Sequence, residues 1–189
     1  MNLSLNAKET ALVLIDLQGG TAARQLAPHT AADVIARSAK LADAVRKAGG
    51  TVVYVHVLLN EIARLPADNP MQRPSEPPPA SASELVPAAG FQEGTDVLIT
   101  KRQWGAFHAT NLDQALRRKN TKTVILAGIA TNFGVESTAR AAQEHGYALV
   151  FAEDAMSSMS AEMHEFSVKT LFPIMGHVRS TEEIMASLA

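Results

Sequence analysis

Residues 123–152 read TVILAGIATNFGVESTARAAQEHGYALVFA, and this stretch decides the fold. The apolar run at 123–128 is rich in Val, Ile and Leu, which is typical of a strand covered on both faces. Residues 133–145 then show helical spacing, and the apolar run at 148–152 predicts a second strand. Because a strand, a helix and a strand follow in order, we expect two parallel strands joined by a right-handed crossover.

The same alternation continues on both sides of this stretch. Apolar runs predict further strands at 11–15, 51–58, 96–100 and 177–179, and helical spacing predicts helices at 30–47, 112–119, 160–172 and from 180 onward. Thr30 with Asp33, and Ser180 with Glu183, have the spacing of helix-capping pairs. The fold class is therefore α/β, a three-layer α/β/α sandwich around a six-stranded, mostly parallel sheet. No repeat is visible, so we expect a single domain over residues 1–189.

One segment interrupts the alternation. Seven of the nine prolines lie between residues 60 and 87, a density that is incompatible with helix interiors and with sheet ladders. We expect a long ordered loop or arm here. Its polar side chains at Arg64, Gln72 and Arg73 are placed either to close over a pocket or to contact a neighbouring subunit.

Composition excludes several classes of function. With 17 Lys and Arg residues against 19 Asp and Glu residues the net charge is -2, so the chain offers no broad basic surface for nucleic acid. No apolar run is long enough for a membrane span, and the N-terminus has no signal-peptide pattern, so we expect a cytoplasmic protein. The absence of cysteine excludes disulfides, thiolate metal sites and thiol nucleophiles.

Three groups of residues follow predicted strands at the point where each strand ends. Asp16 follows the first strand, Lys101 follows the third, and residues 130–134 join the fourth to its helix. Ligands of parallel sheets bind at the carboxyl ends of strands, so these groups predict one pocket. There a carboxylate and an ammonium shift each other's pKa, and the helix start is expected to present free N–H groups at Phe133, Gly134 and Val135.

Each of these residues also has a purely structural interpretation. Asp16 is placed to cap a turn, Lys101 to lie in solvent, and Gly134 to allow a helix to pack closely on the sheet. Trp104 and Phe107 suit either a pocket wall or a subunit interface. His56, within an apolar strand, is expected to be a core histidine with its hydrogen bonds satisfied.

Three blocks of this sequence resemble the isochorismatase-like hydrolase superfamily. Asp16-Leu17-Gln18 resembles the family's Asp-x-Gln, Lys101 matches its lysine, and residues 128–140 with Gly146-Tyr147 and Asp154-Ala155 follow its signature. The resemblance implies a Rossmann-like cysteine-hydrolase fold, with Gly134 at the position of the nucleophilic Cys and a cis peptide at Ile129–Ala130. It also implies substrate-binding residues, namely Gln18, Trp104, Phe107, Ala130, Thr131, Asn132 and Phe133.

What the resemblance implies about chemistry follows from the missing thiol. Family members without the cysteine cleave a vinyl ether with water and release pyruvate, which assigns proton donation to Asp16 and substrate binding or tuning of Asp16 to Lys101. The Lys101 ammonium lowers the pKa of Asp16, whereas burial raises it. Proton donation by Asp16 near neutral pH requires the effect of burial to be the larger of the two. Alternatives are a water-dependent amide or ureide hydrolase, or a silent binding protein that keeps the pocket.

The remaining expectations concern partners. Residues 57–107 contain no histidine, so the metal site of nicotinamidase-like relatives has no ligands here, and we expect no metal and no cofactor. The partner is a small molecule such as a carboxylate. Since family members form dimers and tetramers, we also expect a homo-oligomer. If the arm contacts a neighbouring subunit, deletion of residues 66–79 is expected to lower the measured mass of the assembly.

Overall fold

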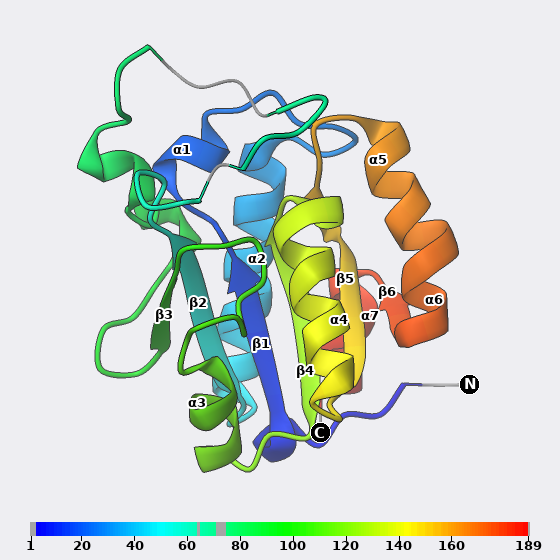
Figure 1. Cartoon of the computed structure of the whole chain (residues 1–189). Helices are drawn as coiled ribbons and strands as arrows, with labels where there is room; N and C mark the ends of the chain where they lie inside the picture. The colour runs from blue at the N-terminus through cyan, green and yellow to red at the C-terminus, as the bar shows by residue number, and fades with distance from the viewer. Residues whose placement is uncertain (1–2, 64, 71–74, 189) are drawn as a thin grey trace.

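A computed structural model describes residues 3–63, 65–70 and 75–188, and Figure 1 shows strands at its centre with helices packed around them. The strands are β1 (Thr10–Ile15), β2 (Thr51–Val57), β3 (Val97–Lys101), β4 (Thr123–Ile129), β5 (Ala148–Ser157) and β6 (His177–Arg179). The helices are α1 (Gly19–Ala22), α2 (Ala31–Lys47), α3 (Leu112–Arg118), α4 (Glu136–Glu144), α5 (Ala161–Phe166), α6 (Phe172–Met175) and α7 (Thr181–Ser187). Short 3-10 helices lie at Ala7–Glu9, Ala80–Ser83 and Pro87–Ala89, and π-helical turns at Thr131–Val135 and Ser167–Leu171.

The six strands form one sheet in the order β3-β2-β1-β4-β5-β6, and every adjacent pair is parallel. The predicted α/β class is confirmed. The chain starts at the centre of the sheet and builds outward on both sides, so the order reverses between β1 and β4. In an open parallel sheet this reversal opens a crevice at the carboxyl ends of the strands, where ligands bind.

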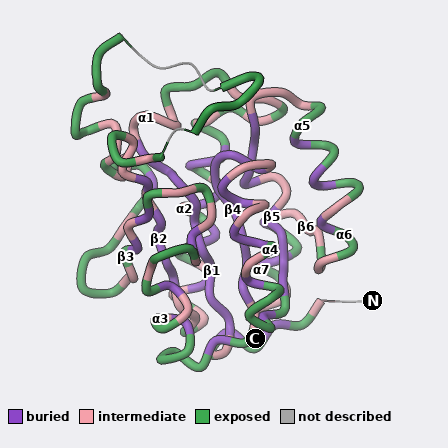
Figure 2. Tube along the Cα trace, viewed as in Figure 1, coloured by how far each residue is buried: buried purple, intermediate pink, exposed green. Residues whose placement is uncertain are grey.

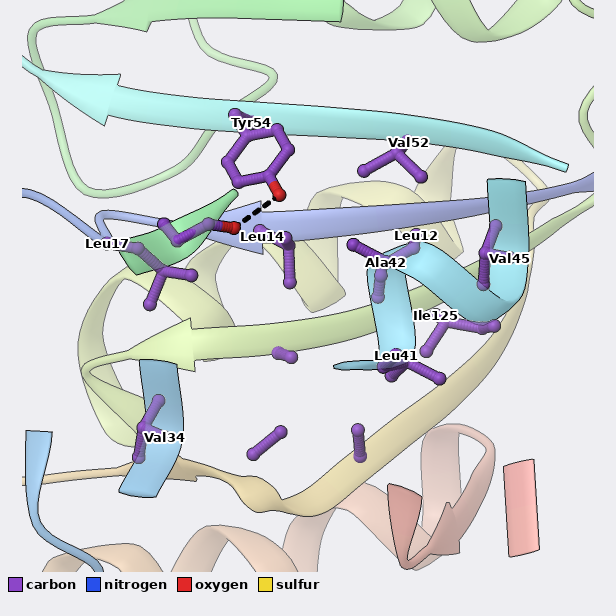
Figure 3. Close-up of a cluster of buried hydrophobic side chains, with 14 of the residues drawn as sticks. Leu12, Leu14, Leu17, Val34, Leu41, Ala42, Val45, Val52, Tyr54 and Ile125 are labelled. Atoms are coloured by element: carbon purple, nitrogen blue, oxygen red, sulfur yellow. Dashed lines mark hydrogen bonds between the residues drawn. The ribbon is translucent and has the colours of Figure 1, made fainter. Parts of the chain in front are cut away.

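Two apolar clusters fill the space between the sheet and its helices, and Figure 2 shows the central strands buried along their length. One cluster packs α2 and α7 against one face, and Figure 3 shows Leu41, Ala42 and Val45 of α2 beside Leu12 of β1. The other cluster packs the opposite face with side chains from α3, α4 and the α5–α6 region. Among the described residues, no helix has both the length and the apolar character needed to cross a membrane.

Most differences from the predicted elements lie at their ends. The helix expected from residue 133 begins two residues earlier, as the π-helical turn Thr131–Val135, and β5 runs on to Ser157 past a register shift opposite Leu126 and Gly128. Gly128 has φ +116, and a side chain there would lie 2.2 Å from the Ile15 carbonyl oxygen. The close approach of β4 to the end of β1 therefore requires glycine.

The later part of the proline-rich arm packs on the segment that follows β1. Gly19 N–H donates to the Glu84 carbonyl at 3.0 Å, and Val86 N–H donates to the Leu17 carbonyl at 3.0 Å. Residues 80–86 are thereby held at the carboxyl end of the sheet, where Figure 1 shows the arm above the strands. Arg64, Gln72 and Arg73, to which we gave a role in the arm, lie outside the described residues.

The predicted cap of α2 is confirmed. Thr30 Oγ1 accepts from Asp33 N–H at 3.1 Å, and Asp33 Oδ2 accepts from Thr30 N–H at 3.3 Å. Thr30→Ala removes this cap and is expected to lower the free energy of unfolding by about 1 kcal/mol. Denaturant unfolding measures the loss. Thr170→Ala, at an exposed threonine, is the control, and an equal loss in both variants would contradict the assignment.

Candidate active site

The carboxyl ends of β1 and β3 bring two charged side chains together below the surface. Lys101 Nζ lies 2.8 Å from Asp16 Oδ2, and the two side chains are only 1% and 8% exposed. Lys101 Nζ also donates to the Trp104 carbonyl at 2.6 Å. The interpretation of Lys101 as a solvated surface lysine is therefore wrong, and the predicted meeting of Asp16 and Lys101 is observed.

The backbone around Asp16 turns sharply so that its carboxyl group faces inward. Asp16 has φ +52, a left-handed conformation that Asp tolerates better than most residues. Its N–H still donates to the Val55 carbonyl at 2.9 Å, which extends the β1–β2 ladder by one residue. Thr21 Oγ1 donates to the Asp16 carbonyl, so α1 holds the turn from the other side.

One oxygen of Asp16 lacks a partner. Oδ2 pairs with Lys101, whereas Oδ1 is buried and has no hydrogen bond to any described residue. Burial raises the pKa of the Asp16 carboxyl to about 6. The Lys101 ammonium lowers this pKa and His56 lowers it by less, but burial has the larger effect. Burial thus wins the competition that the sequence left open, and Asp16 holds its proton at a higher pH than an ordinary carboxyl group does.

Gly134 faces this pair. A methyl group built on Gly134 would lie 3.1 Å from Lys101 Nζ and 3.3 Å from Asp16 Oδ2. It would also lie 2.9 Å from Ile15 Cγ2, closer than real methyl contacts. The Gly134 backbone therefore packs directly against the carboxyl group and the ammonium, and no space remains there for a methyl group. We call the part of the cavity that Asp16, Lys101 and Gly134 line the hollow.

The hollow is part of a cavity of about 80 Å³. Six predicted site residues line it: Asp16, Lys101, Trp104, Ala130, Phe133 and Gly134. Trp104 packs edge-to-face on Phe133 with 5.0 Å between ring centroids, and it is 50% exposed, so it forms an aromatic wall at the opening. The remaining lining is Thr21, Arg24, Val57, Leu59, Ile62, Gln103, Ile129 and Met159.

Four predicted site residues do not line the cavity. Gln18 is fully buried, and its amide bonds the Val57 N–H and the Val57 and Ala82 carbonyls at 2.7–3.0 Å. Gln18 therefore ties the Asp16 turn to β2 and to the arm. Phe107 stacks on His145, with 4.9 Å between the ring centroids.

The other two, Thr131 and Asn132, lie in the loop after β4. Thr131 Oγ1 contacts His164 Nδ1 at 2.9 Å, and Asn132 Oδ1 accepts a hydrogen bond from the Ser158 hydroxyl. Burial lowers the pKa of His164 to about 4, so this contact involves a neutral imidazole near neutral pH. The two side chains hold the cavity loop against α5 and the end of β5.

The backbone of this loop agrees with the prediction in one respect and differs in another. The cis peptide expected at Ile129–Ala130 is present. The N–H groups of Phe133 and Val135, which we expected to be free, both donate to the Ala130 carbonyl, at 3.1 and 3.2 Å. The tight π-helical turn folds that carbonyl back over them. An anion cradle made of three free N–H groups is therefore not formed.

Sequence reasoning missed the walls that come from loops. Arg24, Leu59, Ile62 and Met159 have no periodic or motif signal that marks them as cavity residues. His56 behaves as predicted, because both ring nitrogens have partners, the Ser83 carbonyl at 2.7 Å and Thr100 Oγ1 at 2.8 Å. Within the described ranges, no cluster of three or more His, Asp or Glu side chains is arranged to hold a metal ion.

The parallel sheet and the buried carboxyl–ammonium pair at its carboxyl edge are the arrangement expected from the resemblance to the isochorismatase-like hydrolases. Residues 10–183 match the family described as Isochorismatase domain. The chain belongs to the isochorismatase family and is a hydrolase of that family.

Individual relatives extend this match. The uncharacterized isochorismatase family protein YecD of Escherichia coli O157:H7 is 45% identical over 98% of this chain and 100% of its own length. The structure of an isochorismatase family protein from Burkholderia thailandensis is 38% identical with a TM-score of 0.92, covering 100% of this chain and 99% of that one. Ureidoacrylate amidohydrolase RutB of Variovorax paradoxus is 26% identical over 99% of this chain and 84% of its own.

Proposed function

We propose that this protein cleaves a small vinyl ether with water and releases pyruvate, with Asp16 as the acid and Lys101 as its charged partner. The observation that carries the proposal is the state of Asp16, whose pKa is raised to about 6, whose Oδ1 is buried without a hydrogen-bond partner, and whose side chain lines the hollow with Gly134. A carboxyl group that holds its proton up to about pH 6 and lines a cavity is suited to protonate a substrate bound there.

The steps follow from that arrangement. The Asp16 carboxyl group transfers its proton to the terminal carbon of the enol ether, leaving an oxocarbenium ion. Water adds to the cationic carbon and gives one proton back to the Asp16 carboxylate, forming a hemiketal. The hemiketal hydroxyl then loses its proton as its carbon releases the ether oxygen, that oxygen takes up a proton, and pyruvate and the alcohol leave. One water is consumed, and Asp16 ends the cycle protonated.

The other residues have supporting roles in this proposal. The Lys101 ammonium stabilises the Asp16 carboxylate once the proton has left. Their 2.8 Å contact lowers the free-energy cost of the buried negative charge. The attacking water occupies the hollow, because Gly134 offers no nucleophilic side chain there. The Trp104 and Phe133 rings limit access of bulk water to the cation.

The first test is pyruvate release from isochorismate and simpler enol ethers. Coupled reduction of the pyruvate by lactate dehydrogenase measures the rate. Because Asp16 must carry its proton, kcat/KM should be level below about pH 6 and fall towards tenfold per pH unit above it. The free-enzyme profile measures this directly. A rate that rises through pH 6 would make Asp16 a base and contradict the proposed order of proton transfers.

A second candidate function has one specific support. The relative RutB is named a ureidoacrylate amidohydrolase, which favours amide or ureide hydrolysis by activated water in the same cavity. Ammonia release from small amides and ureides, without pyruvate release from enol ethers, would select this reaction. Tight binding of a carboxylate with neither product would instead select a binding protein that keeps the pocket.

A further inference from the structure

The charge of the cavity lining is unbalanced. Its titratable side chains are Asp16, Lys101 and Arg24. With Asp16 ionised the lining carries one net positive charge, and with Asp16 protonated it carries two. Lys101 is already paired with Asp16 and Trp104, so the excess charge belongs to Arg24. The Arg24 side chain is exposed, with no ion pair or hydrogen bond to any other side chain in the described part of the chain.

Arg24 is held at the opening by a segment that is fixed at both ends. Before it, Arg24 N–H donates to the Thr21 carbonyl at 3.2 Å, and Thr21 is tied to the Asp16 carbonyl. After it, Ala27 and Ser158 exchange two backbone hydrogen bonds of 2.9 and 3.1 Å. One short segment therefore carries both the buried acid and Arg24, and its hydrogen bonds hold the Arg24 backbone at the opening.

The walls between these two groups are apolar. The aromatic walls are Trp104 and Phe133. The aliphatic walls are Val57, Leu59, Ile62, Ile129 and Met159. Gln103 adds one amide that has no side-chain hydrogen bond among the described residues. A ligand that fits has a small flat or unsaturated body in contact with the rings and an anionic group at the opening, where a guanidinium forms paired hydrogen bonds.

We propose that Arg24 binds a carboxylate of the substrate and so makes the enzyme prefer small carboxylates over their neutral analogues. The proposal rests on the proposed function only for which end of the substrate meets Asp16. The guanidinium holds a carboxylate at the opening, and the body of the ligand then extends along the apolar walls to the hollow beside Gly134. Arg24 is a specificity-determining residue in this assignment, since it does not contact the reacting atoms.

The test is a binding measurement, which needs no turnover. Benzoate, phenylacetate and pyruvate are titrated calorimetrically into the full chain, with benzamide as the neutral probe. Trp104 is the only tryptophan of the chain and lines the cavity, so its fluorescence reports whether each probe enters. Arg24→Met is compared with Arg118→Met, which removes the same charge from an exposed arginine at the end of α3.

We expect at least one carboxylate to bind and to change Trp104 fluorescence. Its Kd should rise about tenfold in Arg24→Met, stay unchanged in Arg118→Met and be partly restored in Arg24→Lys, while benzamide binding stays equal in all. Equal carboxylate binding by the wild type and Arg24→Met, or no carboxylate binding, would overturn the proposal. Arg24-dependent binding without pyruvate release would refute the vinyl-ether reaction and leave the anion site standing.

Discussion

Asp16→Asn is expected to lower kcat/KM for the vinyl ether by about 10²–10⁴-fold, the contribution of a positioned general acid. The asparagine amide has nearly the same shape as the carboxyl group but has no proton to donate at any accessible pH. The break near pH 6, which follows from the raised pKa of Asp16, should disappear with it. Pyruvate release measured over the full pH range reports both effects together.

Glu144→Gln is the matched control, because it makes the same change from acid to amide at an exposed position at the end of α4. It should leave the rate and the pH profile unchanged. Since Asp16→Asn leaves the buried Lys101 without a counter-charge, denaturant unfolding must show that the variant is folded at the assay temperature. A folded Asp16→Asn variant with wild-type activity would remove Asp16 from the mechanism.

The meeting of Asp16 with Lys101 could be predicted because it depends on topology. Both residues end parallel strands, and β1, β2 and β3 are neighbours in the sheet, so their carboxyl ends share one edge. Apolar runs and helical spacing were sufficient to place those strands. The outcome of the competition at Asp16 could not be predicted, because it depends on how completely the surrounding side chains exclude water.

Other features depend on loops and local backbone, and these were missed. Arg24 and Met159 reach the cavity from connecting segments, where side-chain direction does not follow a repeating pattern. Helix α1 begins at Gly19-Gly20, which gives no helical signal. The Phe133 and Val135 N–H groups were expected to be free because an ordinary helix start leaves them so, whereas the π-helical turn returns them to Ala130.

The close packing at the edge of the hollow can be tested by adding a side chain at Gly134. Gly134→Ala adds one methyl group, which would lie 3.1 Å from Lys101 Nζ, 3.3 Å from Asp16 Oδ2 and 2.9 Å from Ile15 Cγ2. The backbone there is not left-handed, so alanine adds no conformational strain. The methyl group forces the Ile15, Lys101 and Asp16 side chains to move and so shifts the acid, and kcat/KM for pyruvate release should fall on the order of a hundredfold.

Gly105→Ala provides the matched control for this substitution. Its methyl group would lie 3.6 Å from Ser137, an ordinary contact, and Gly105 does not line the cavity. We therefore expect Gly105→Ala to keep wild-type activity. Because Gly134→Ala removes neither charge, the pH at which its remaining activity declines should stay near that of the wild type. Full activity in Gly134→Ala would show that water attacks from elsewhere, and the role of the hollow would have to be abandoned.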